Sequence, residues 1–213
     1  MKIVKAALFM PAMFLLAMGF IMGEAMEASA LSKEIAPDVS PEILEKLLPD
    51  AEVYMTGSGS KEVLLLADPF CENSRKTYRL LQTRLEQIRT LRILWVSAFP
   101  EKGSEIVAAA AMKMQASGKG ESALKTVFNL DIPPSAKIGR AREDALVIVN
   151  EKFRADLGEM DLHHLKPELE QLQGSTNLAK ETGYTGTPHF IVGGRVLHGY
   201  SGPALRILLK QGP

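Results

Sequence analysis

The sequence holds a single cysteine, Cys71, and the residues around it suit thiol chemistry. A thiolate is the nucleophile in thiol–disulfide exchange. A cysteine without a second cysteine in its chain is buried and inert, bonded to another molecule, or kept because it reacts. Ser74 follows three residues later, where its hydroxyl could donate a hydrogen bond to the sulfur from one helical turn away. One cysteine can build neither a structural disulfide nor a cysteine-based zinc site.

The segments on either side of Cys71 predict its position. Residues 63–67 form a continuous apolar run, which is typical of a central strand buried on both faces. Apolar residues then recur at helical spacing to about Arg89, and residues 91–98 predict a second buried strand. Strand, helix and strand in this order form a right-handed crossover between parallel neighbours. Cys71 would therefore open a helix at the carboxyl end of a strand, where open α/β sheets place reactive groups.

This position decides which chemistry is open to Cys71. Backbone N–H groups and the helix dipole stabilise a thiolate at a helix N-terminus, and Glu72 opposes this by like-charge repulsion. Exchange passes through a mixed disulfide that a second cysteine normally resolves. Ser74 cannot form a disulfide, so the mixed disulfide must be resolved by a thiol of the substrate or by a small thiol. A dithiol oxidase is not expected; disulfide shuffling, capping by a small thiol and reduction of an oxidised partner cysteine stay open.

The N-terminus predicts export. Lys2 and Lys5 precede an apolar run over residues 6–22, and a small-x-small cleavage site ends at Ala30. Residues 1–30 are therefore interpreted as a signal peptide that is cleaved after Ala30. The alternative is an uncleaved anchor helix, since the run is near the length that spans a bilayer. In both cases the lysines hold the N-terminus inside, so the remainder is delivered outside the cytoplasm.

The remainder predicts an N-terminal helical arm over residues 31–50 and one domain over 51–213, with a mostly helical insert at about 102–173. The arm is expected to pack on the domain, with a role in oligomerisation as the alternative. The predicted elements are a helix after Ser40, a strand over 51–56, helices over 105–117, 121–128 and 138–157 with a break at Pro133-Pro134, a helix over 176–182, strands over 189–192 and 195–198 joined by Gly193-Gly194, and a helix over 203–210.

Composition narrows the partners. Lys and Arg number 25 and Asp and Glu number 25, so no strong field draws the chain to nucleic acid. His163 and His164 are expected on a solvated helix face, since adjacent helical residues point in different directions. Trp95, Met112 and Met114 are expected in the core. No metal and no cofactor are expected.

Four stretches in this order resemble the thioredoxin superfamily. They are the run Leu66-Ala67-Asp68-Pro69-Phe70-Cys71-Glu72-Asn73-Ser74, a helical insert, Gly186-Thr187-Pro188 entering a strand, and Gly199-Tyr200 before the last helix. The likeness spans residues 51–210 and is greatest to the bacterial periplasmic disulfide isomerases of the DsbC/DsbG type, relatives of DsbA. The chain departs from that family at Ser74, where the family's Cys-x-x-Cys motif has its second cysteine. The arm also stands in place of the family's N-terminal dimerisation domain.

The resemblance implies an α/β, thioredoxin-like fold whose helical insert separates a βαβ half from a C-terminal ββα half. It implies that the Thr187–Pro188 bond is cis and lies beside Cys71, with the Thr187 backbone pairing with an extended substrate. Cys71 and Ser74 would be catalytic, and Thr187 and Pro188 would bind substrate. His189 could reach the site, but the alternation of strand side chains favours a place on the sheet surface. The implied location is the periplasm, with membrane contact only through an uncleaved signal segment.

Three functions fit these residues. The first is a monothiol disulfide isomerase or reductase that acts on exported proteins with cysteines and needs a small thiol or redox partner protein for release. The second is a binding module, a chaperone or assembly factor that uses the groove around Pro188, with Cys71 as a covalent tether. The third is a structural protein with an inert thiol. We predict the first, because a helix N-terminus activates a cysteine.

Overall fold

The computed structural model describes residues 35–131 and 140–210, so the predicted signal segment and the Pro133-Pro134 break lie outside the described residues. The strands are β1 (Ile35–Asp38), β2 (Glu52–Thr56), β3 (Lys61–Ala67), β4 (Ile88–Trp95), β5 (His189–Val192) and β6 (Arg195–His198). The helices are α2 (Pro41–Leu47), α3 (Glu72–Gln82), α4 (Ser104–Ala116), α5 (Gly120–Phe128), α6 (Ala141–Lys152), α7 (Arg154–Leu157), α8 (Lys166–Glu181) and α9 (Gly202–Lys210), with 3₁₀ turns η1 (Leu85–Gln87) and η2 (Pro100–Lys102).

The described strands form a six-stranded sheet in the order β1-β6-β5-β3-β4-β2. β3 is central, parallel to β4 and antiparallel to β5. Residues Val63–Ala67 are all buried because helices cover both faces of this strand. The predicted crossover is therefore confirmed, with α3 connecting β3 to β4.

The C-terminal hairpin has the predicted strands. β5 and β6 pair antiparallel from His189 opposite His198 to Val192 opposite Arg195. The turn residues Gly193 and Gly194 have φ of 56° and 76°, which residues with a Cβ adopt at a steric cost. The sheet and its two halves confirm the predicted α/β, thioredoxin-like fold.

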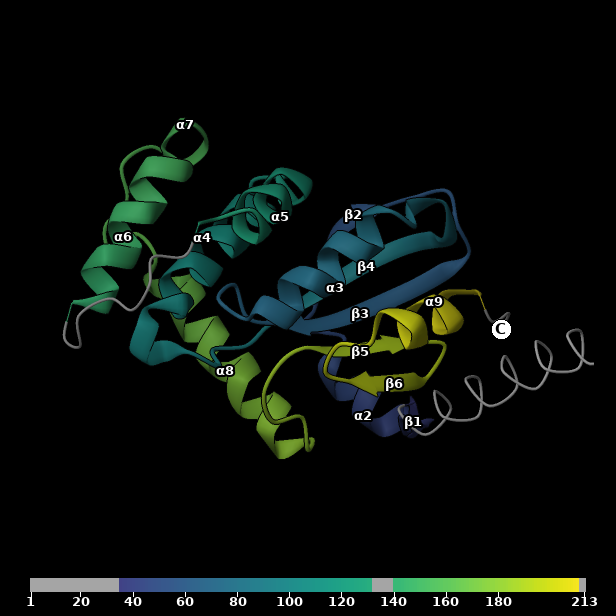
Figure 1. The fold of residues 1–213 in the computed structure, drawn as a ribbon. Helices are drawn as coiled ribbons and strands as arrows, with labels where there is room; N and C mark the ends of the chain where they lie inside the picture. The colour runs from purple at the N-terminus through teal and green to yellow at the C-terminus, as the bar shows by residue number, and fades with distance from the viewer. Residues whose placement is uncertain (1–34, 132–139, 211–213) are drawn as a thin grey trace, which may run out of the picture.

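Side chains alternate between the two faces of the sheet and define two core clusters. On one face, Val63 and Leu65 pack with Leu81 of α3 and Leu205 of α9. On the other face, β-strand side chains pack with Leu47 of α2 and with Ala179 near the end of α8. Figure 1 shows α4 to α7 standing beside the sheet, on the side where β3 ends and α3 begins.

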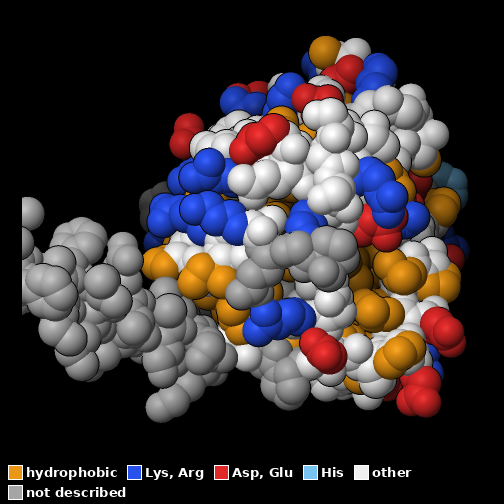
Figure 2. All heavy atoms as spheres, turned by 90° about the vertical axis from the view of Figure 1, so that its right-hand side faces the viewer, with side chains coloured by type: hydrophobic (Ala, Val, Ile, Leu, Met, Phe, Trp, Pro, Cys, Tyr) orange, Lys and Arg blue, Asp and Glu red, His pale blue; other side chains and the backbone are white. Residues whose placement is uncertain are grey.

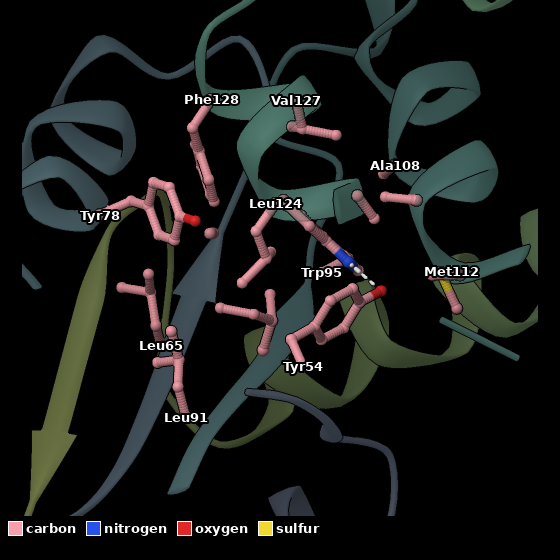
Figure 3. Packing of buried hydrophobic residues seen from close by; sticks show 14 of the residues in the cluster. Tyr54, Leu65, Tyr78, Leu91, Trp95, Ala108, Met112, Leu124, Val127 and Phe128 are labelled. Atoms are coloured by element: carbon pink, nitrogen blue, oxygen red, sulfur yellow. Dashed lines mark hydrogen bonds between the residues drawn. The ribbon is translucent and has the colours of Figure 1, made fainter. Parts of the chain in front are cut away.

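Aromatic rings join the insert to the sheet, as Figure 3 shows. The ring of Phe128 stacks on Tyr78 and on Trp95, with centroids 4.6 Å and 5.6 Å apart. The Trp95 indole Nε1–H donates to the Tyr54 hydroxyl at 2.7 Å. Trp95 is thus buried with its polar atom paired, and its predicted place in the core is confirmed, as are those of Met112 and Met114.

Several elements differ from the predictions, and the single helix expected over 138–157 is divided at Phe153 into α6 and α7. β1 was not predicted and pairs with β6 at the sheet edge. α8 begins at Lys166 rather than at Thr176, because buried residues on either side of Gly174 pack the helix and offset the cost of a helical glycine, about 1 kcal/mol. α3 ends at Gln82 and not near Arg89. Ile88 fits the helical period but is the first residue of β4.

Charges of both signs lie on the surface (Figure 2), and their total numbers in the sequence are equal. Figure 2 shows both basic and acidic side chains on the face that lies at the right of Figure 1, with most of the apolar side chains of that view in its lower half. His163 and His164 are exposed in the turn before α8, not on a helix face as predicted, and His164 pairs with Asp161. Among the described residues, no helix has the length and apolar character needed to span a membrane.

Candidate functional site

Cys71 is the N-cap residue of α3, immediately beyond the carboxyl end of β3. Its carbonyl accepts from the Arg75 N–H (3.1 Å), and its own N–H donates to the Asp68 carbonyl (3.2 Å). The residue is 7% exposed and is followed by the exposed Glu72 and Asn73. The sulfur therefore lies at the edge of the core, next to the surface.

The loop before β5 meets this cysteine. The Cys71 Sγ donates a hydrogen bond to the Thr187 carbonyl at 3.3 Å, although 116 positions separate the two residues. The Thr187–Pro188 peptide bond is cis, and the Pro188 carbonyl accepts from the Gly199 N–H at 2.8 Å. Three of the four predicted site residues thus lie together.

Ser74, the fourth, is fully buried. Its Oγ accepts a hydrogen bond from the Asp68 N–H at 3.5 Å, a contact that the sequence analysis did not predict. The expected bond from this hydroxyl to the Cys71 sulfur stays a prediction. Ser74 therefore contacts the loop that leads into the cysteine.

Two influences on Cys71 oppose each other. The N-terminus of α3 favours the thiolate. The Thr187 carbonyl accepts from the S–H group, so it favours the thiol and would repel an anion placed against its oxygen. A substrate N–H that bound the Thr187 oxygen would remove this opposition.

Asp68 is the central polar residue under the site, and the sequence analysis gave it no role. One carboxylate oxygen accepts from the Phe70 N–H (2.7 Å). The other accepts from the backbone N–H groups of Ala98 (2.8 Å) and Phe99 (3.2 Å) and from the Ser104 hydroxyl (2.8 Å). Complete burial raises the pKa of the Asp68 carboxyl above its ordinary range, although these hydrogen bonds lower it. Asp68 thereby connects the cysteine loop, residues 68–71, to the start of α4.

Replacing Asp68 by Ala is expected to lower the free energy of unfolding by about 3 kcal/mol, since buried N–H donors lose their acceptor. Asp68→Asn, a change of nearly the same size, keeps one acceptor oxygen and should cost less than the alanine variant. Urea unfolding followed by circular dichroism measures both. Equal stability of Asp68→Ala and wild type would contradict this role.

Arg75 braces the same loop from α3. It is 4% exposed, its Nε donates to the Pro69 carbonyl (3.0 Å), and its Nη1 donates to the Leu130 carbonyl (2.5 Å). Burial lowers the pKa of the Arg75 guanidinium. The cysteine loop is thus joined to the end of α5.

His189 does not point to the sulfur. Its ring is buried, with Nε2 3.2 Å from the Thr185 carbonyl oxygen and Nδ1 2.9 Å from Nδ1 of His198. The sequence analysis weighed His189 as a candidate but did not anticipate the pair. Its position opposite His198 follows from the hairpin register, which the glycine turn predicts.

A cavity of about 400 Å³ opens beside the loop. It includes Gly186, one residue before Thr187, and it is also lined by the segment after β4 and the C-terminal end of α8. Its lining is Val96, Ser97, Ala98, Pro100, Glu101, Thr176, Ala179, Lys180, Tyr184 and Gly186.

The central parallel pair, the C-terminal hairpin and a cysteine N-cap facing a cis-proline loop define a thioredoxin-like fold. Solved structures share it. A periplasmic thioredoxin-like protein from Salmonella enterica serovar Typhimurium matches with a TM-score of 0.60 at 15% identity, over 81% of this chain and 96% of that one. A thioredoxin-like oxidoreductase from Silicibacter pomeroyi matches with a TM-score of 0.55 at 23% identity, over 79% and 98%.

The thiol-disulfide exchange protein alpha-DsbA2 from Wolbachia pipientis matches with a TM-score of 0.52 at 14% identity, over 79% of this chain and 92% of that one. At these identities the likeness establishes the fold. No family model matches the sequence, and no curated protein does. Within residues 35–131 and 140–210, no group of three or more His, Cys, Asp and Glu side chains is arranged to hold a metal ion.

Proposed function

We propose that this chain is an exported thiol–disulfide exchange protein that acts on protein thiols through Cys71, as a monothiol disulfide isomerase or reductase. The observation that carries the proposal is the 3.3 Å contact of the Cys71 sulfur with the Thr187 carbonyl, at the N-terminus of α3. A nucleophile then lies beside a backbone segment with which an extended polypeptide can pair. In this proposal the Ser74 hydroxyl donates a hydrogen bond to the Cys71 sulfur, and Thr187 and Pro188 bind the substrate.

In this proposal the Cys71 thiolate attacks a substrate disulfide, forming a mixed disulfide and releasing one substrate thiolate. As an isomerase, another substrate thiolate attacks the mixed disulfide, forming a rearranged substrate disulfide and regenerating Cys71. As a reductase, two small thiols act in turn: the first frees the substrate thiol and caps Cys71, and the second removes the cap as a small disulfide. Electrons balance in both cases without a second cysteine.

Export and a periplasmic location belong to the same proposal. The N-terminal lysines followed by an apolar run support export. The similarity to a periplasmic thioredoxin-like protein also supports it. The proposed substrates are exported proteins with cysteines, and the proposed resolving agent is a small thiol or a redox partner protein.

A second candidate is a binding module without turnover, which uses the groove around Pro188 and keeps Cys71 as a tether. The cavity of about 400 Å³ next to Gly186 favours it, since this volume suits a bound side chain or short segment. The 7% exposure of Cys71 also favours it, because shielding slows attack on a bulky disulfide.

Alkylation by iodoacetamide tests whether Cys71 is activated. An unstructured thiol keeps about 0.3% of its high-pH rate at pH 6. The enzyme proposal requires Cys71 to keep a clearly larger fraction, because an activated cysteine stays nucleophilic at a pH where an ordinary thiol does not. Dividing each rate by the same protein's rate at high pH cancels the shielding of the sulfur. A retained fraction equal to that of an unstructured peptide thiol would remove the basis of the enzyme proposal.

A further inference from the structure

Three rings lie directly behind the cis-proline loop. His189 begins β5 immediately after Pro188, and His198 stands opposite it on β6. The Tyr184 ring centroid is 5.0 Å from that of His189 and 6.0 Å from that of His198, with an angle of 29° between the planes of the Tyr184 and His198 rings. These rings connect the loop of residues 185–188 to the sheet.

The contacts determine which ring nitrogens carry hydrogen. The Thr185 carbonyl can only accept, so Nε2 of His189 must be its donor at 3.2 Å. Neutral His189 then accepts at Nδ1, and His198 must donate from its own Nδ1 across 2.9 Å. A directed chain of hydrogen bonds therefore runs from His198 through His189 to the Thr185 carbonyl.

This chain ends at the segment that touches the sulfur. Thr185 precedes Thr187 by two residues, and the Thr187 carbonyl accepts from Cys71. On the other side, Gly199, the residue after His198, donates to the Pro188 carbonyl at 2.8 Å. The loop is thus held by a side chain at its start and by the backbone at its end.

We propose that His189 is a positioning residue that holds the loop of residues 185–188 against Cys71, and that protonation of His198 tightens this hold. The proposal rests on the proposed function only in that the positioned atom is the sulfur of exchange. His198 is exposed and its Nε2 is not used in the chain, so a proton added there leaves both hydrogen bonds in place. A charged donor makes a stronger hydrogen bond, and each bond in a chain polarises the next.

A second proton would break the chain, because His189 would then present Nδ1–H to the Nδ1–H of His198. In the described part of the chain, His189 faces His198 on β6, Tyr184, the backbone of Thr185 and Gly186, and its apolar partner Leu66 on β3. Burial lowers the pKa of His189, and the charge of His198 lowers it further, although the backbone contacts raise it. The folded chain therefore resists a proton on His189.

The first test compares Cys71 alkylation in variants at pH 7. His189→Leu removes the donor to Thr185, so the loop of residues 185–188 is held less tightly against the Cys71 sulfur. The alkylation rate should rise about threefold or more, the factor that corresponds to one net hydrogen bond. His189→Gln places an amide N–H near the position of Nε2 and should restore the rate to near that of wild type. Thermal unfolding checks that both proteins are folded. Equal alkylation rates for folded wild type and folded His189→Leu would overturn the positioning role.

The second test does not depend on Cys71 reactivity. Backbone amide resonances of Gly186 and Thr187 are followed by NMR between pH 8 and pH 5, together with the ring resonances of His198. In wild type the amide resonances and the ring resonances should change over the same pH range. His198→Asn keeps a donor near Nδ1 but does not titrate, so the pH-dependent change of the amide resonances should be less than half of that in wild type. Unchanged amide shifts would overturn the link to protonation, whether or not Cys71 proves reactive.

The pH dependence of folding gives a further readout with a definite sign. The unfolded chain binds a proton at His189 near its ordinary value of 6.5, whereas the folded chain resists that proton. The free energy of unfolding should therefore fall as the pH falls through this value toward the lowered pKa. His189→Gln should flatten this slope between pH 7 and pH 5, and an unaltered slope would contradict the buried, neutral state assigned to His189.

Discussion

Replacing Cys71 by Ser is expected to abolish disulfide shuffling. In an assay that refolds a scrambled-disulfide protein in a glutathione buffer, the rate should fall to that of the buffer alone, because the serine hydroxyl is not ionised at neutral pH and cannot form a mixed disulfide. The serine hydroxyl is close in size to the thiol and can donate to the Thr187 carbonyl in its place, so the fold should persist. Thermal unfolding provides this control.

The same variant separates the two candidate functions. If wild type accelerates refolding and Cys71→Ser does not, the protein turns over through its sulfur. If both suppress aggregation of an unfolded substrate equally and neither accelerates disulfide rearrangement, the binding module is the correct function. Omitting glutathione distinguishes isomerase from reductase, because an isomerase is resolved by substrate thiols and a reductase consumes small thiol.

Replacing Ser74 by Cys is expected to create dithiol chemistry. Cys71 caps α3 and position 74 lies in its first turn, within the separation that a disulfide can bridge. A neighbouring thiol resolves the mixed disulfide within the molecule, so release of the substrate should accelerate about 100-fold or more at low concentrations of external thiol. Ser74 is buried, which would shield the new thiol from outside reagents.

Thiol titration and mass spectrometry measure this change. Oxidised Ser74→Cys should contain no free thiol and should be lighter by about 2 Da than the reduced form, as formation of one disulfide requires. Thr77→Cys is the matched control, since Thr77 is also buried on α3 but lies about 9 Å along the helix axis from Cys71 and is out of reach. Equal gains in both variants would show that resolution is intermolecular, and no gain in Ser74→Cys would show that the site differs from a dithiol site by more than one residue.

Much of the site follows from local sequence. The apolar run at 63–67 predicts a buried strand, and the helical spacing after it predicts α3, so the place of Cys71 at their junction can be derived from periodicity. The nearness of Thr187 and Pro188 to Cys71 could not be derived in this way. It was implied only by the resemblance. Cys71 and Thr187 are 116 positions apart, and the order of the strands in the sheet brings their segments together.

The sequence by itself determined the central strands, the glycine hairpin and the helix that starts at Cys71, because periodicity and turn chemistry act over a few neighbouring residues. Only the tertiary structure decided the edge strand β1, the four donors on Asp68 and the pairing of His189 with the Thr185 carbonyl. These contacts depend on which groups meet when the layers pack, and a buried polar group accepts whichever partner that packing supplies.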